Sequence, residues 1–430
     1  MQDSGSPPDA VPSLSKQERS RWRPLWLLLF LVALLWSYRT TEIDPLLLLQ
    51  AESRANMWEF LSGMFPPDLS WSFLASLLRP TLETIQISLM GMLIAILIGF
   101  PLALLATSNL VFSGILHAYT QTSWQRQGGR VLLYLLARAL LNLFRAVPEF
   151  VWALLFVRVV GLGPFPGVLA IGVAYGGILG KVYAEILEEV EPRPLEALQS
   201  TGASQLQILC YGFLPQVLPH AAAYTLYRWE CAIRAAAIMG FVGAGGIGQQ
   251  LELTMRMFDY RQVMTCLLII FLLVTVVDQL SALAQRYLAG RREKAWGAAS
   301  VWGLGLLLLF LWAYHGSGVK PLLLLGAEGR RQVLAFITQL FPPDLSLAFL
   351  QETLLAAGET LAIAFMGTLL AVGIAFFLSL PASQIFMAEG VVSTREAGTG
   401  RYLRLCASLL ARGLLNILRS IPELIWALVF

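Results

Sequence analysis

Residues 81–107 read TLETIQISLMGMLIAILIGFPLALLAT and carry a single charged side chain, Glu83. A helix of this length can span the hydrocarbon core of a bilayer, which needs about 20 apolar residues. Similar stretches recur along the 430-residue chain, which is 57% hydrophobic and 13% charged, with a formal net charge of +3. Because soluble domains carry about 25% charged residues, this composition excludes a soluble enzyme, a disordered tail and a nucleic-acid binder. The sequence therefore predicts an all-α integral membrane protein, built as a polytopic helical bundle.

Nine apolar stretches are long enough to be predicted as transmembrane helices, if tilt and burial in protein are allowed for. They are residues 24–38, 81–107, 131–157, 164–182, 216–240, 262–285, 299–315, 353–383 and 405–430. The first could also be a secretory signal peptide, because a basic flank precedes a short apolar core. However, residues 36–39 (WSYR) are not a small-residue cleavage site, which favours a membrane anchor.

The distribution of Lys and Arg near the span ends predicts the orientation, because cytoplasmic loops are enriched in both. The tail before residue 24 holds four of them, and the loop after residue 285 is also basic. The amino terminus is therefore expected in the cytoplasm, and six spans return the chain there near residue 288. Residues 181–215, also expected in the cytoplasm, are unusually acidic.

The chain contains an internal repeat. Residues 65–70 (FPPDLS) recur identically as residues 341–346, an offset of 276 positions. Residues 138–156 align with residues 412–430 and keep Arg, Pro, Glu and Trp in register. At the first offset two further pairs recur, Glu83-Thr84 as Glu359-Thr360 and Met90-Gly91 as Met366-Gly367. Apolar bias cannot align polar residues in this way, so the sequence predicts a tandem duplication.

The duplication sets the expected domain organisation. Residues 1–23 form a cytoplasmic tail, residues 24–288 a first unit of six transmembrane helices, residues 289–298 a basic cytoplasmic linker and residues 299–430 a second unit that stops after its third helix. Six spans is an even number, so both units enter the membrane in the same direction and are related by an axis along the membrane normal. The second unit is either truncated or a remnant.

A spaced motif lies in the loop between the fourth and fifth spans. Glu196 and Ala197 are followed by Gly202 and, twelve and thirteen residues beyond that glycine, by Leu214 and Pro215. We expect a short helix with Ala197 on its packed side and a turn that Gly202 permits, which together form a compact knob able to transmit movement. An ordinary solvated turn between two spans is the alternative.

This spacing resembles the EAA loop of ABC importer permeases, the cytoplasmic element that docks into a separate ATPase subunit. Most of the chain, about residues 45–288 and again 321–430, resembles the phosphonate permease subfamily. The segments that carry the resemblance are residues 65–68, 145–152, 161–165, 196–215, 227–234 and 242–248, with Asp278 and Ser281. Two positions depart from the family pattern: Ala232 replaces the usual Asn, and Gly212 replaces the usual aliphatic residue.

The resemblance implies a type I importer permease fold, similar to that of methionine importer permeases, in the bacterial cytoplasmic (inner) membrane. It also implies that the chain has no ATPase site of its own. The implied partners are a cytoplasmic ABC ATPase dimer and an extracytoplasmic solute-binding protein, and a second permease chain or a second copy of this chain could complete the assembly. The implied activity is import of phosphonate or a related phosphorus oxyanion by alternating access.

Charged residues within spans tend to face a bundle interior or a pathway, because charge is costly in lipid. Arg138, Arg145 and Glu149 in the third span lie at i, i+7 and i+11, on one helical face. Glu230 and Arg234 in the fifth span are an i, i+4 pair. These residues either contact an anionic substrate or pair as Arg145–Glu149 and Glu230–Arg234 to neutralise each other. The full set of candidate path residues is Arg145, Glu149, Trp152, Glu230, Arg234, Gly243, Gly245 and Gly246. A broken or tightly packed turn is also predicted at the outer end of the fifth span, from the glycine cluster Gly240, Gly243, Gly245, Gly246 and Gly248.

Other functions find less support in the sequence. A secondary transporter or channel, the main alternative, would need ion-coupling carboxylates and no docking loop. A membrane-embedded enzyme is weaker, because no Ser-His-Asp, metal or paired-carboxylate set converges. Four Cys and three His are scattered, so neither a metal nor a cofactor is predicted. Residues 175–182 lack both the first glycine and the final hydroxyl residue of a nucleotide-binding loop.

Overall fold

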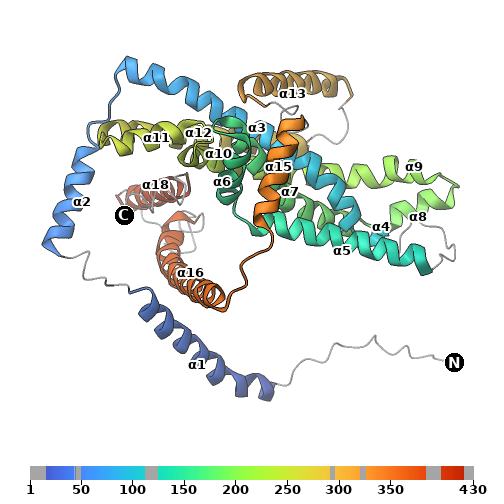
Figure 1. Ribbon diagram of the computed structural model, residues 1–430, viewed down its shortest axis with the longest axis horizontal. Coiled ribbons are helices and arrows are strands. Elements are labelled where there is room, and N and C mark those ends of the chain that lie inside the picture. Colours follow the sequence, from blue (N-terminus) through green and yellow to red (C-terminus); the bar gives the residue numbers. More distant parts are fainter. Residues whose placement is uncertain are drawn as a thin grey trace. The chain divides into compact units, whose positions relative to one another are not determined.

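The structure, a computed structural model, describes residues 16–42, 44, 50–111, 124–290, 296–319, 326–383 and 399–420. Every regular element within those ranges is a helix (Figure 1). The predicted all-α fold is therefore confirmed for the part of the chain that the structure describes.

The helices fall into two compact units, residues up to Trp58 with Pro342–Leu415, and Glu59–Phe341 with Asn416–Phe430. In the first unit, α1 (Lys16–Thr40) packs against α16 (Leu347–Ala382). The rings of Phe30 and Phe365 meet edge to face there, with their centroids 5.7 Å apart. Most of α16 is exposed within this unit, with Ala362 as its buried residue.

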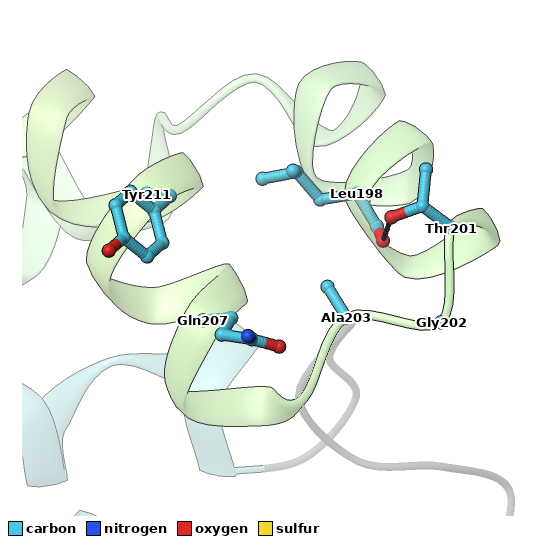
Figure 2. Close-up of a pocket in the computed structure, with 6 residues that line it drawn as sticks. All are labelled: Leu198, Thr201, Gly202, Ala203, Gln207 and Tyr211. Carbon is cyan, nitrogen blue, oxygen red and sulfur yellow. Dashed lines mark hydrogen bonds between the residues drawn. The ribbon is translucent and has the colours of Figure 1, made fainter.

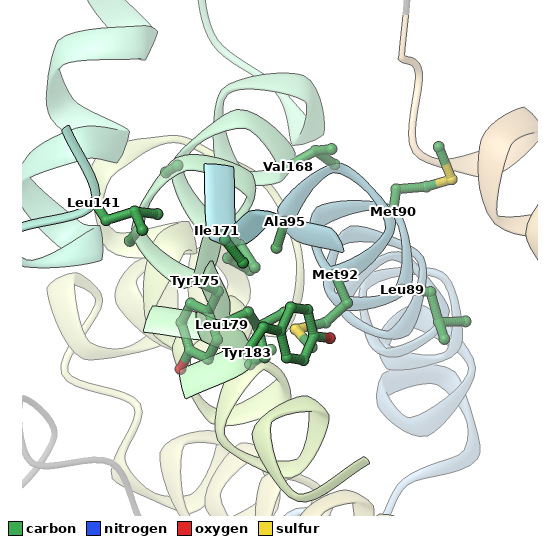
Figure 3. Packing of buried hydrophobic residues seen from close by; sticks show 14 of the residues in the cluster. Leu89, Met90, Met92, Ala95, Leu141, Val168, Ile171, Tyr175, Leu179 and Tyr183 are labelled. Carbon is green, nitrogen blue, oxygen red and sulfur yellow. The ribbon is translucent and has the colours of Figure 1, made fainter. Parts of the chain in front are cut away.

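The core of the second unit is the packing of α3 (Trp71–Ala106) against α7 (Pro164–Glu188), seen in Figure 3. Glycines bring the two backbones close together. A Cβ atom on Gly99 would lie 2.7 Å from the carbonyl oxygen of Gly176, and one on Gly180 would lie 2.9 Å from the carbonyl oxygen of Gly99. Close approach through small residues is typical of membrane helices, because lipid chains supply no hydrophobic drive for helix association. Buried apolar side chains fill the remaining space, among them Ile87, Ala95, Val168, Ile171 and Leu179.

The predicted third span, residues 131–157, is not one straight helix. It consists of α5 (Trp124–Ala146) and α6 (Glu149–Val160), which meet at 92°. Pro148 lies between them, and a proline both lacks the N–H that a helix needs and disfavours helical backbone at the residue before it. The prediction that Glu149 shares a helical face with Arg138 and Arg145 is therefore wrong, because the bend separates Glu149 from the other two.

The fifth predicted span ends in a glycine turn, as expected. α10 (Leu214–Met239) is followed by a short 3₁₀ turn and then by α11 (Ile247–Arg256), and the chain bends by 45°. Gly243, Gly245 and Gly246 have φ angles of 79°, 77° and 78°, a conformation that L-residues other than glycine rarely adopt. α12 (Tyr260–Gly290) then packs against α10.

In the part of the chain that the structure describes, four helices are long and apolar enough to cross a membrane, namely α3, α7, α12 and α16. Up to six spans result if each of two bent pairs counts as one. The bent pairs are α5 with α6, and residues 208–242 with α11. Within the described residues, the other predicted spans also form helices, α1, α13 (Trp296–Gly316) and α18 (Thr399–Ser420). They are not among these six, although α13 contains the shorter apolar helix Leu307–Gly316.

Helix bounds recur at the offset of the sequence repeat. α3 and α16 both have 36 residues and begin at Trp71 and Leu347, 276 positions apart. α2 (Ala51–Gly63) and α15 (Ala327–Leu340) begin at the same offset. One contact recurs as well: Nε of Arg138 donates to the Ala106 carbonyl at 3.1 Å, and Nε of Arg412 to the Ala382 carbonyl at 3.0 Å. The rest of the second motif, residues 421–430, lies outside the described residues.

Candidate functional site

The loop with the spaced motif folds into short helices. α8 (Pro192–Ser200) carries Glu196 and Ala197, and both side chains are exposed. Gly202 follows in the left-handed conformation with φ of 80°, and its N–H donates to the carbonyl of Gln199 at 3.0 Å. α9 (Gln205–Gln207) and a π-helix, η2 (Ile208–Phe213), then lead into Leu214 and Pro215 at the start of α10. The predicted short helix and glycine turn are present.

The packed face of α8 differs from the one expected. Leu195, not Ala197, is buried, with 4% of its surface exposed. Leu195 and Leu198 lie against Gly212 of η2, where an added Cβ would approach their side-chain methyl carbons to 2.6 and 2.8 Å. Gly212 therefore permits the contact between α8 and η2. The sequence singled out this glycine only as a departure from a pattern, and its role depends on which leucines it meets.

A surface cavity of about 340 Å³ opens between α8 and η2 (Figure 2). Its lining mixes polar and apolar groups, and consists of Leu198, Thr201, Gly202, Ala203, Gln207 and Tyr211. The Thr201 hydroxyl donates to the Leu198 carbonyl at 2.7 Å, which fixes the rim next to the glycine turn. The Tyr211 side chain is 76% exposed at the opposite wall. The loop thus contains a cavity that is open at its surface.

The acidic character of residues 181–215 has a partial structural explanation. The first eight of these residues belong to α7, not to the loop. Glu185 forms an ion pair with Lys181 at 3.2 Å, and Glu188 forms one with Arg138 of α5 at 2.8 Å. Oε1 of Glu188 also accepts the backbone N–H of Ser108 at 2.8 Å. Glu188 thus ties the end of α7 to Arg138 of α5 and to Ser108, whereas the pair of Glu185 with Lys181 lies within α7.

The candidate path residues on α10 form a charge cluster. Glu230 is 7% exposed, and Arg234 lies 3.8 Å from it, so the predicted i, i+4 ion pair is confirmed. Arg419 of α18 also contacts Glu230 and lies 3.9 Å from Asp278 of α12. The backbone carbonyl of Arg419 accepts a hydrogen bond from Arg234 at 3.1 Å. Arg419 and Asp278 were not predicted to belong to this cluster.

The other predicted ion pair, Arg145–Glu149, is not formed. Nε of Arg145 donates instead to the side-chain oxygen of Asn142 at 3.2 Å, because the bend at Pro148 carries Glu149 away. Trp152 fastens α6 to α5 across the same bend, since its indole N–H donates to the Phe144 carbonyl at 3.1 Å.

Two residues of α3 hold the glycine turn. Oε2 of Glu83 accepts the N–H of Gly246 at 2.9 Å, and the hydroxyl of Thr84 accepts the N–H of Ile247 at 2.9 Å. These N–H groups stand at the start of α11 and have no partner within that helix. On the other side of the turn, Gly243 accepts through its carbonyl from the N–H of Gly163 at 2.9 Å. Glu83 and Thr84 were not among the predicted site residues, although their recurrence as Glu359-Thr360 was a signal.

Comparison with known proteins relates this chain to transport proteins. A family model described as "Binding-protein-dependent transport system inner membrane component" matches residues 114–294. HtxC of Stutzerimonas stutzeri, whose name assigns it to a phosphite transport system as a permease, is 38% identical over 255 residues, which is 59% of this chain and 82% of HtxC. The phosphate-import permease protein PhnE of Mycolicibacterium smegmatis is 30% identical over 383 residues, 87% of this chain and 64% of PhnE.

A solved structure is similar as well. A chain of the MetNI methionine ABC transporter in an inward-facing conformation superposes with a TM-score of 0.44 at 22% identity, over 51% of this chain and 99% of that chain.

Proposed function

This chain belongs to the family of inner membrane components of binding-protein-dependent transport systems, among ABC permeases related to phosphite and phosphonate transport, and from that premise we propose that it is the membrane-spanning subunit of an importer for phosphonate or a related phosphorus oxyanion. Energy for import comes from ATP hydrolysis in separate subunits. The solute is delivered by an extracytoplasmic binding protein, whose selectivity sets which oxyanion is imported.

The observation that carries this proposal is the geometry of the loop from Glu196 to Pro215. The buried Leu195 and the partly buried Leu198 hold α8 to the bundle, while Glu196 and Ala197 on its surface are exposed and available to a partner. The cavity beside Gly202 supplies a hollow for a protruding side chain of that partner. A firmly anchored helix with an exposed face is suited to dock an ATPase and to move as one body with the span behind it.

Movement of α8 would reach the bundle through η2. Gly212 brings η2 into direct contact with α8, and η2 continues without a break into α10. π-helical turns are frequent at functional sites within helices. ATP binding in an ATPase dimer would draw two such loops together and rotate the bundles, so that the path alternates between the two sides of the membrane.

The remaining parts of the proposal concern assembly. The amino terminus lies in the cytoplasm and α8 on the same side, consistent with the basic flanks of the first and sixth spans. The matching bounds of α3 and α16 support a tandem duplication of the unit. A symmetric ATPase dimer needs two such loops, of which residues 196–215 supply one.

The test is co-purification of this chain with a candidate ATPase subunit from the same transport system. Gly202→Asp places a side chain at a left-handed position next to the cavity, and Glu196→Lys reverses a charge on the exposed face of α8. Both variants are expected to release the ATPase or to uncouple its hydrolysis from transport. Glu52→Lys, an equal charge reversal on the exposed surface of α2, is the control and should leave the complex intact. Failure of the wild-type chain to bind any ATPase, or binding that survives both loop variants, contradicts the proposal.

A further inference from the structure

Arg228 lies in the middle of α10. It is 14 residues after Leu214 and 11 before Met239, so at 1.5 Å per residue it stands about 21 Å from one end of the helix and about 16 Å from the other. If α10 crosses the membrane, this guanidinium is close to the centre of the bilayer. The side chain is partly exposed within the described structure.

Two tyrosines of the same helix hold the guanidinium. Nε of Arg228 donates to the phenolic oxygen of Tyr224 at 2.7 Å. Cζ of Arg228 lies 5.2 Å from the centre of the Tyr224 ring and 5.6 Å from that of Tyr227. Cation–π contacts of this kind orient a guanidinium but leave its charge in place.

Within the described residues, no carboxylate lies within ion-pair distance of Arg228. Its neighbour on the helix, Arg234, pairs with Glu230 at 3.8 Å, and Arg419 contacts the same carboxylate. The acid closest in sequence to Arg228 is thus already engaged by two other cations. An uncompensated charge at the centre of a membrane helix is expensive, and residues of this kind face a bundle interior or a water-filled path.

The helix that carries Arg228, α10, packs against α7 and α6. Tyr175 of α7 is 5% exposed, and it interacts electrostatically with Glu149 of α6 and with Arg228 and Arg234 of α10. The terminal nitrogens of Arg228 donate to no protein acceptor in the described structure, whereas those of Arg234 donate to the Arg419 carbonyl and to Sγ of Cys231.

We propose that Arg228 is a contact point for the phosphorus oxyanion on its way across the membrane. Its two terminal nitrogens can donate in parallel to two oxygens of a phosphite or phosphonate group, a geometry that a guanidinium matches and an ammonium does not. The aromatic rings of Tyr224 and Tyr227 keep the planar group from swinging, so less conformational freedom is lost when the anion arrives. This inference rests on the proposed importer function and adds a substrate-contacting residue to it.

The experiment compares Arg228→Gln, Arg228→Lys and Tyr224→Phe with wild type in vesicles that contain the chain, its ATPase and its binding protein. The probe is phosphite at a concentration below half-saturation, and ATP hydrolysis is followed in parallel. Removing a charge-assisted hydrogen bond to an anion is expected to lower the uptake rate about 10- to 100-fold. The Arg228→Gln variant should show this reduction in uptake rate while it still binds the ATPase. Arg228→Lys keeps the charge and should show an uptake rate between those of Arg228→Gln and wild type. Tyr224→Phe removes the acceptor of the Arg228 hydrogen bond and should lower the uptake rate a few fold. Arg256→Gln, which removes an exposed arginine paired with Glu252 on α11, is the control and should leave uptake unchanged.

Several results would overturn the inference. An uptake rate of Arg228→Gln within twofold of that of wild type overturns it directly. If Arg228→Gln prevents assembly of the complex and Arg228→Lys restores it, Arg228 forms an ion pair with a carboxylate of another chain and does not contact the substrate. An effect seen in vesicles of phosphatidylglycerol but not of phosphatidylcholine assigns it to a lipid phosphate, whereas an equal effect in both supports the transported anion. If the wild-type chain binds its ATPase but imports no oxyanion, or binds no ATPase, the proposed function itself fails and this inference fails with it.

Discussion

Glu83 on α3 accepts a hydrogen bond from the backbone N–H of Gly246 at 2.9 Å, across 163 positions of sequence. The turn at Gly246 has a positive φ, and the N–H groups that open α11 have no acceptor within their own helix. Thr84 accepts the next of these, from Ile247. α3 therefore provides the amino-terminal cap of α11 in place of a residue of α11 itself.

Glu83→Ala is expected to lower the free energy of unfolding by about 1–3 kcal/mol, because it leaves a buried backbone donor without a partner. Thermal unfolding of the purified chain in detergent measures the change. Glu359→Ala is the matched control, since Glu359 occupies the repeat-equivalent position on α16 and is exposed. Equal shifts in the two variants would contradict the capping role.

Gly91→Ala is expected to destabilise the packing of α3 on α7 by about 1–3 kcal/mol, the usual cost of overfilling a packed contact. Its Cβ would lie 2.6 Å from Cγ2 of Ile171, which is fully buried. Gly367→Ala at the repeat-equivalent position of α16 meets nothing within 4 Å and should be neutral or slightly stabilising, since alanine favours helix. Unfolding temperatures of the two variants in the same detergent provide the comparison, and a Gly91→Ala variant as stable as Gly367→Ala would refute it.

Gly212→Val is expected to uncouple ATP hydrolysis from uptake with little effect on the rest of the bundle. The added side chain would enter the space of Leu195 and Leu198 and push α8 away from η2. Reconstituted vesicles report both hydrolysis and uptake. Gly129→Val, on α5 with open space around its Cα, controls for the change in helix propensity. Normal coupling in Gly212→Val would show that movement does not pass through this contact.

Asp68, in the loop before α3, makes the stability of the fold depend on pH. Hydrogen bonds from the backbone and side chain of Ser70 lower the pKa of Asp68 below its ordinary value of 3.8. A carboxyl with a lowered pKa in the folded state stabilises the fold above its unfolded pKa, and this contribution is lost as the pH falls through the lower folded value. We therefore expect Asp68→Ala to lower the unfolding temperature at pH 7 and at pH 5 by the same amount, and the difference from wild type to shrink below pH 3.8.

The variant Asp344→Ala distinguishes the contribution of this local turn to stability from the contribution of the contact with α12. Asp344 accepts the N–H of Ser346 at 2.9 Å, as Asp68 accepts that of Ser70 at 3.0 Å. Asp68 additionally accepts from the side chain of Gln262 at 3.4 Å on α12. A larger shift for Asp68→Ala than for Asp344→Ala is expected, and identical shifts would mean that the contact with α12 contributes nothing.

The sequence alone determined the features that depend on local chemistry. The apolar run of residues 81–107 predicted a spanning helix, because span length and hydropathy are properties of one segment. Gly202, Gly243 and Gly246 predicted turns, because only glycine adopts positive φ at little cost. The i, i+4 spacing of Glu230 and Arg234 predicted their ion pair, since both lie on one unbroken helix. Pro148 indicates the bend that separates Arg145 from Glu149. The apolar run of residues 131–157 nevertheless led to the prediction of one continuous span.

Tertiary structure decided the features that depend on which helices meet. Leu195, not Ala197, became the anchor of α8 because Gly212 lies opposite it. Glu83 became a cap because α3 passes the start of α11, 163 positions away. The carboxylate of Glu230 is shared between Arg234 and Arg419, which leaves Arg228 on the same helix without an acidic partner in the described structure. Each of these outcomes depends on contacts between helices far apart in the chain, and residue spacing within one helix does not encode them.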